Sequence, residues 1–148
     1  PPAPSACGDG TGNSALVPAP PVVLVVDVAN VMGSRPDGWW RNRAAAAARL
    51  LAEIAPLHGS QVTAPDGRRL ADLRLVAVLE GQARDVAAPE GVEAVRATAD
   101  GDSAVVALAE ELVDTGDLVL VVTADRGLRA RLPSSVLVAG PRWILAGQ

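Results

Sequence analysis

Two runs of valine and leucine, each leading to an aspartate, constrain the fold of this 148-residue chain more than any other feature. Residues 22–26 read VVLVV and end at Asp27, and residues 118–122 read LVLVV and lead after two residues to Asp125. Neither run alternates between apolar and polar residues, as the strand of a half-exposed sheet would. Both are therefore predicted to be adjacent central strands, buried on both faces, in a parallel sheet.

The rest of the chain alternates between short apolar runs and longer helix-like segments. Further strands are predicted at residues 73–79, 92–95 and 136–138, and helices at residues 39–55, 102–113 and 126–132. Residues 33–38 are expected to form a loop, and residues 61–72, with a Pro-Asp-Gly turn, either a small hairpin or a long loop. This order predicts an α/β domain: a three-layer sandwich with a mostly parallel central sheet between helices.

The first 21 residues differ from the rest in composition, being rich in Pro, Gly, Ala and Ser without periodicity. We expect residues 1–21 to be a flexible tail and residues 22–148 to be one domain. The glycines at positions 8, 10 and 12 are spaced as in a dinucleotide-binding loop, but no strand precedes them, so they carry no weight. The single cysteine, Cys7, excludes an internal disulfide and a cysteine-rich zinc site.

Composition also excludes several classes of function. All 13 basic residues are arginines, so the lysine that a phosphate-binding P-loop or a two-component receiver needs is absent. A net charge of −4 argues against a broad basic surface for duplex DNA, although local arginine clusters could contact a single strand. No apolar run approaches the ~20 residues that span a bilayer, and the start lacks a signal-peptide pattern. We therefore expect a cytoplasmic protein without a membrane partner.

Acidic residues stand where predicted strands end. Asp27, Glu80 and Asp125 each follow a strand, and Asp100 and Asp102 precede a helix that should begin at the same edge. In parallel α/β sheets ligands bind beyond the carboxyl ends of the strands. Carboxylates crowded at such an edge repel one another and stay ionised only when a cation lies among them.

Oxygen ligands of this kind are preferred by Mg²⁺ and Mn²⁺, and water polarised by such an ion can attack phosphorus. We therefore expect Asp27, Asp102 and Asp125 to bind Mg²⁺ or Mn²⁺ and to be the catalytic acids. Glu80 carries less weight, because Gly81 after it suggests a turn.

A structural role is the alternative for each acid taken singly. Aspartate is a common helix N-cap, and Asp102 and Asp125 both stand where a cap would. Asp125 could also pair with Arg126 or Arg129. Jointly, several acids at strand ends favour a functional site.

Polar and basic residues near the predicted strand ends are candidates for substrate binding. Asn30 either directs its amide at the site or caps the loop backbone. Guanidinium groups bind phosphate oxygens bidentately, although many of these arginines could instead form solvated helix faces. The arginines fall into two groups: Arg35, Arg41 and Arg43, and Arg126, Arg129 and Arg131. We expect the substrate to contact Asn30, Arg35, Arg41, Arg126 and Arg129.

Aromatic side chains are scarce, and two of the three tryptophans are neighbours. Trp39 and Trp40 could stack on a base, but in a chain without Phe or Tyr we expect one of them to belong to the core. The single histidine, His58, stands at the end of a predicted helix, where capping is a better explanation than catalysis.

Three motifs in this order resemble the PIN-like and NYN group of nuclease domains, especially small actinobacterial members. They are a D-x-x-N after the first strand, GDSAVVALAEEL at a middle helix, and a T-x-D-R after a late strand, and the resemblance spans residues 22–143. It implies a parallel α/β sheet, an acidic Mg²⁺ or Mn²⁺ site and, in many members, cleavage of RNA. Asp27 and Asn30 match the first motif, Asp102 the second and Asp125 the last.

The chain also departs from this pattern. Ser103 stands where similar sequences have a second acid, and Val28 replaces a small residue. Asp100 could substitute for the missing acid, but its spacing is wrong by several positions. We predict a metal-dependent hydrolase of phosphodiester bonds, a ribonuclease on single-stranded RNA. Three alternatives stay open: a nucleoside triphosphate pyrophosphohydrolase, a catalytically impaired RNA- or nucleotide-binding module, and a structural domain of a larger chain. A homo-oligomer is equally open.

Overall fold

The computed structural model of the chain describes residues 19–146. The tail expected at residues 1–21 lies outside them apart from its last three positions, as does Cys7. Among the described residues, no helix is long and apolar enough to cross a membrane.

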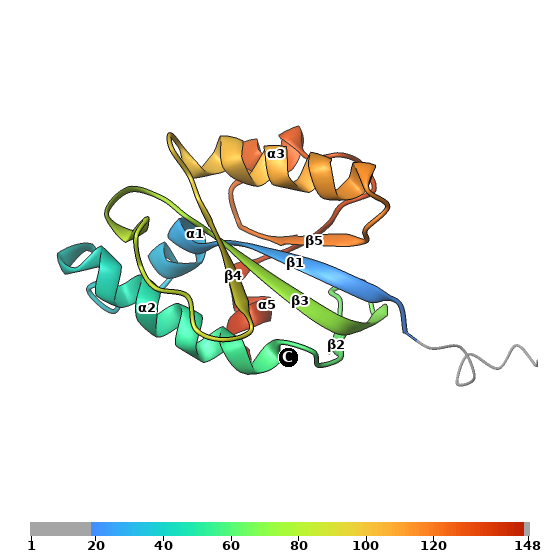
Figure 1. Cartoon of the computed structure of the whole chain (residues 1–148), viewed down its shortest axis with the longest axis horizontal. Coiled ribbons are helices and arrows are strands. Elements are labelled where there is room, and N and C mark those ends of the chain that lie inside the picture. Colours follow the sequence, from blue (N-terminus) through green and yellow to red (C-terminus); the bar gives the residue numbers. More distant parts are fainter. Residues whose placement is uncertain (1–18, 147–148) are drawn as a thin grey trace, which may run out of the picture.

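A six-stranded sheet forms the middle layer (Figure 1). Five strands run parallel in the spatial order β4-β3-β1-β5-β6, and β2 pairs antiparallel with the start of β3. The strands are β1 (Pro21–Asp27), β2 (Val62–Thr63), β3 (Arg69–Leu79), β4 (Val92–Arg96), β5 (Val119–Val122) and β6 (Leu137–Ala139).

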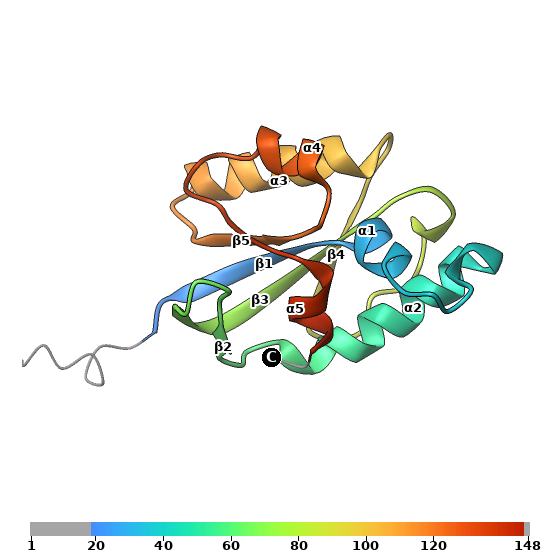
Figure 2. The same ribbon diagram turned by 180° about the vertical axis from the view of Figure 1, so that it is seen from behind.

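Helices cover both faces of this sheet. Figures 1 and 2 show α3 and α4 on one face and α1, α2 and α5 on the other. The α-helices are α1 (Val28–Gly33), α2 (Arg43–Ile54), α3 (Gly101–Asp114), α4 (Arg126–Arg131) and α5 (Pro141–Leu145). Single 3-10 turns are η3 (Trp39–Arg41), η4 (Ala55–Leu57) and η5 (Gly81–Ala83).

Strand β1 supplies both halves of the core. Leu24 and Val26 pack into the cluster under α1, α2 and α5, whereas Val23 and Val25 pack into the cluster under α3 and α4. Burial on both faces is the reason why the strand shows no alternation. The predicted α/β sandwich is therefore confirmed, with β1 and β5 as adjacent central strands.

Several local predictions differ from the structure. The helix expected at residues 39–55 is interrupted, because the Asn42 side chain accepts a hydrogen bond from Ala45 N at 3.0 Å and starts α2 at Arg43. Helix α1 occupies residues for which no element was predicted, and α5, which starts at a proline, was also missed. The segment at residues 61–72 is a hairpin rather than a long loop.

Replacing Leu24 with alanine tests the importance of β1 to the core. Its side chain is 0% exposed, so Leu24→Ala should lower the free energy of unfolding by about 2–5 kcal/mol. The matched change Leu108→Ala, at a half-buried position of α3, should lower the free energy of unfolding clearly less. Urea unfolding followed by tryptophan fluorescence measures both, and equal losses would contradict the central place of β1.

Candidate functional site

Asp27 ends the central strand and is buried there. Its residue is 3% exposed, and β1 is flanked by β3 and β5 through parallel pairing, so the sheet itself fixes its position. One carboxylate oxygen accepts a hydrogen bond from Asn30 N at 3.5 Å and caps α1. The burial expected from the apolar strand is therefore confirmed.

A threonine that the sequence analysis gave no role links the ends of β1 and β5. The Thr123 hydroxyl donates to Asp27 Oδ2 at 3.0 Å and accepts from Asp125 N at 3.1 Å. Thr123 and Asp27 are the two fully buried polar or charged residues among those described. A polar residue directly after a buried valine run was the signal that could have identified it.

A second side chain crosses between the same two strand ends. Asn30 Oδ1 accepts a hydrogen bond from Ala124 N at 2.8 Å. Asn30 therefore binds the turn after β5 instead of capping the loop that contains it. Within residues 19–146 its amide nitrogen donates no side-chain hydrogen bond.

Asp125 and Asp102 have different local roles. Asp125 Oδ1 accepts from Leu128 N at 3.0 Å, so Asp125 caps α4 as the structural alternative predicted. Asp102 is not a cap: Asp100 Oδ1 accepts from Ser103 N at 2.6 Å, which makes Asp100 the N-cap of α3. Asp102 lies in the first turn, half-buried, with its carboxylate close to that of Asp125.

The acids act on one another electrostatically. The pKa of Asp27 is raised from 3.8 to about 6. Burial is the largest cause and the charges of Asp102 and Glu80 contribute, while the hydrogen bonds from Thr123 and Asn30 oppose the rise. Burial and then the charge of Asp125 raise the pKa of Asp102 as well. None of the ion pairs found in residues 19–146 includes any of these four acids. The edge therefore carries negative charge without a salt-bridge partner there.

Glu80 has a closer tie to this edge than the sequence suggested. A Cβ atom at residue 101 would overlap Glu80 Oε2, so the Glu80 carboxylate lies directly against Gly101, the first residue of α3. The positive end of a helix favours a carboxylate at this position. Glu80 directly follows β3, and Gly81 begins a 3-10 turn, as the sequence predicted for this segment.

The carboxylates at this edge suit a hydrated metal ion better than an ion enclosed by protein ligands. Within residues 19–146, no three His, Cys, Asp or Glu side chains lie close enough to hold an ion together. Mg²⁺, however, keeps several waters and is commonly held by one or two carboxylates together with substrate phosphates. A buried Asp27 beside a second carboxylate and without a cationic partner in this region suits such a hydrated ion. The assignment of Asp27, Asp102 and Asp125 as metal ligands stays a prediction.

The expected substrate-binding arginines divide by their contacts. Arg35 is occupied in a two-point ion pair with Glu53, at 2.6 and 2.7 Å. Arg41 lies over the Trp40 ring. Arg126 and Arg129 are exposed on α4, directly after Asp125.

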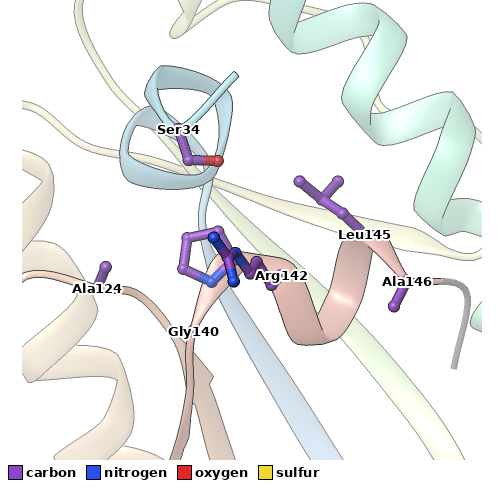
Figure 3. A pocket seen from close by; sticks show the side chains of 7 residues that line it. Ser34, Ala124, Gly140, Arg142, Leu145 and Ala146 are labelled. Atoms are coloured by element: carbon purple, nitrogen blue, oxygen red, sulfur yellow. The ribbon is translucent and has the colours of Figure 1, made fainter. Parts of the chain in front are cut away.

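Two hollows lie on either side of the acidic edge. The larger, an open pocket of about 680 Å³, is built by the end of α1, the turn after β5 and α5 (Figure 3). Its charged side chain is Arg142, which the sequence analysis did not single out; an arginine just after a strand-ending Gly-Pro was the available signal. The smaller, about 90 Å³, is lined on the β3 side by Arg43 and Glu80 among others.

Titration of Asp27 should be visible in protein stability. An acid whose pKa is raised in the folded state favours folding when protonated, so this contribution is lost as pH rises from about 4 through 6. The shift from 3.8 to about 6 corresponds to about 3 kcal/mol. Without divalent metal, Asp27→Asn should therefore gain stability over the wild type across this interval. Urea unfolding in EDTA measures it, with exposed Asp85→Asn as control; parallel curves for Asp27→Asn and wild type would contradict the assignment.

Removing the Thr123 hydroxyl tests the link between the strands. Thr123→Val keeps the shape but leaves Asp27 Oδ2 and Asp125 N without this partner, which should cost about 1–3 kcal/mol. It should also raise the pKa of Asp27 further, because the hydroxyl bond lowers it. Thr123→Ser, which keeps the hydroxyl, should stay close to wild type. Carboxyl carbon NMR titration reports the pKa, and equal values in the two variants would exclude the link.

Comparison with known proteins supports the architecture. No protein-family model matches the sequence, and no curated protein sequence matches it. Among solved structures, the crystal structure of Rae1 (YacP) from Bacillus subtilis matches with a TM-score of 0.64 at 18% identity, covering 84% of this chain and 71% of that one. Its W164L mutant matches with 0.60 at 19%, covering 84% and 72%. At such identity the likeness shows the fold alone, and it confirms the PIN-like α/β architecture expected from the sequence.

Proposed function

We propose that this domain is a Mg²⁺- or Mn²⁺-dependent hydrolase of phosphodiester bonds that cuts single-stranded RNA in the cytoplasm. The observation that carries the proposal is Asp27, a buried carboxylate at the end of the central strand whose pKa is raised by burial and by neighbouring acids. Such a group is unfavourable without a cation, and strongly perturbed acids at strand ends are typical of functional sites. The motif resemblance to NYN and PIN-like nucleases and the fold shared with Rae1 also support it.

Each acid has a role that follows from its position. Asp27, held by the sheet and by Thr123, would hold the ion together with Asp102. When bound, the ion supplies positive charge to the phosphate oxygens and makes nearby water more acidic. Asp125 Oδ1 is engaged at α4, which leaves its second oxygen, on the side of Asp102, to hold the ion.

The reaction needs one proton acceptor. A water oxygen forms a bond to phosphorus and loses one proton, while the bond from phosphorus to the leaving nucleotide oxygen breaks and that oxygen takes up a proton from solvent. We assign that proton to Asp102, whose carboxylate has a second oxygen that can accept it when the first holds the ion. Substrate phosphates would contact Asn30 through its amide, and Arg41, Arg126 and Arg129 through their guanidinium groups. Arg35 would contribute only by releasing Glu53.

A second candidate is a binding module that has lost turnover. Two observations favour it: no three acids in the described part of the chain are close enough to share an ion, and Ser103 stands where a further acid would complete the set. The pyrophosphohydrolase alternative uses the same metal chemistry, so only the substrate distinguishes it.

One assay separates these candidates. Labelled single-stranded RNA and nucleoside triphosphates are incubated with the protein in Mn²⁺, in Mg²⁺ and in EDTA. Asp27→Asn and Asp125→Asn should abolish metal-dependent hydrolysis, whereas Asp85→Asn should not. Arg129→Ala should instead raise KM, by an amount equivalent to about 1–3 kcal/mol, and less at high salt.

Metal binding is measured independently of turnover. Because an ion that binds only the folded state stabilises it, Mn²⁺ at about 100 times its Kd should add about 2.7 kcal/mol and raise the melting temperature of the wild type but not of Asp27→Asn. An unchanged melting temperature together with no cleavage would exclude the hydrolase. RNA binding without cleavage would instead establish the binding module.

A further inference from the structure

Trp40 is the exposed large hydrophobic side chain of the described region. Trp40 is 54% exposed and lies in the middle of η3, which begins directly after Gly38, a residue with left-handed backbone conformation. Trp39 beside it is half-buried and packs on Gly33 at the end of α1. A Cβ atom added to Gly33 would lie 3.6 Å from the Trp39 ring. The two indole rings are 5.9 Å apart and perpendicular, at 89°. Trp39 thus anchors the turn, and Trp40 presents its ring to solvent.

Two guanidinium groups accompany these rings. Arg41 lies 5.8 Å from the centre of the Trp40 ring, and Arg43 lies 4.9 Å from the centre of the Trp39 ring. Neither takes part in an ion pair within residues 19–146, whereas Arg35 and Arg49 nearby do. Trp39, Trp40, Arg41 and Arg43 are called the Trp40 platform below. It combines an exposed aromatic surface with positive charge that no described carboxylate neutralises.

The Trp40 platform adjoins the acidic edge. Arg43 lines the smaller hollow together with Glu80 and with Val28, the residue that follows Asp27. Only α1 and a short loop separate Asp27 from η3 along the chain. The hollow shared by Arg43, Glu80 and Val28 therefore connects the Trp40 platform to the acidic edge.

We propose that the Trp40 platform is a subsite for one unpaired nucleobase of a single-stranded nucleic acid, with Arg41 and Arg43 on its neighbouring phosphates. The inference deepens the proposed function and rests on it for the class of ligand. Bases stack on an exposed aromatic side chain with little regard to sequence, but only when they are unpaired. An apolar protein partner would not use the two free cations, whereas a polyanion does.

Binding is measured without cleavage, using the wild-type chain in EDTA and fluorescence anisotropy of a labelled unstructured RNA and a duplex of equal length. Trp40→Ala should raise Kd for the single strand roughly 5- to 150-fold. Trp40→Phe keeps an aromatic face and should stay near wild type, whereas Trp40→Leu keeps only apolar bulk and should behave like alanine. Because Trp40 is exposed, unchanged melting temperatures should show that all three variants are folded.

The arginines give an independent measurement. Arg41→Ala and Arg43→Ala should each reduce the slope of log K against log salt by about 0.7, the value for one phosphate contact with a single strand. Arg68→Ala removes an exposed arginine from the β2–β3 hairpin, at the other end of β3, and serves as the matched control with no change.

Three outcomes would overturn the subsite: wild-type affinity in Trp40→Ala, equal affinities in Trp40→Phe and Trp40→Leu, or Trp40-dependent binding of the duplex as tight as that of the single strand. A change in the sedimentation of the free protein on Trp40→Ala would also overturn it, because the surface would then bind a second copy. Failure of the two proposals is distinguishable. Trp40-dependent binding without any hydrolysis would support the subsite and refute the nuclease. Cleavage of RNA with an unchanged KM in Trp40→Ala would support the nuclease and refute the subsite.

Discussion

One hydroxyl group at the end of the two central strands determines how the acidic edge is arranged. Thr123 donates to Asp27 and accepts from the backbone of Asp125, so a single side chain positions a buried acid and the start of α4 together. The Asn30 contact with Ala124 adds a second link between the same strand ends. Strand pairing therefore fixes the position of Asp27, and the contacts of Thr123 and Asn30 hold the turn before Asp125 beside it.

The charges of the chain are distributed so that this edge keeps its negative potential. Arg35, which follows α1 near this edge, forms an ion pair with Glu53 instead of with the acids. Burial then makes the repulsion at Asp27 stronger than it would be in water, because the surrounding medium screens poorly. An ion and a phosphate group together would supply the positive charge and the oxygen contacts that the described residues do not.

The sequence predicted what depends on local pattern and missed what depends on contacts between distant residues. The two central strands and the burial of Asp27 followed from apolar runs that do not alternate. Helix α1 has six residues, too few to show a helical period, and Asn42 redirected the start of α2 by capping it. Asp100 and Asp102 are equally plausible caps in the sequence, and only the direction of the chain entering α3 decides between them. The Arg35–Glu53 pair, 18 positions apart, and the Thr123 link, 96 positions apart, have no local signature.

The meeting of Glu80 and Gly101 has a consequence for how this protein can vary. A side chain at position 101 would occupy the place of the carboxylate at position 80, so these two positions, 21 apart in the chain, share one space. The overlap falls on the far end of a flexible side chain, so a library that varies position 101 would accept alanine once the glutamate rotates away. Alanine would change where that acid points and not whether it is present. Position 101 therefore adjusts the distribution of charge along this edge more than it limits which residues the fold tolerates.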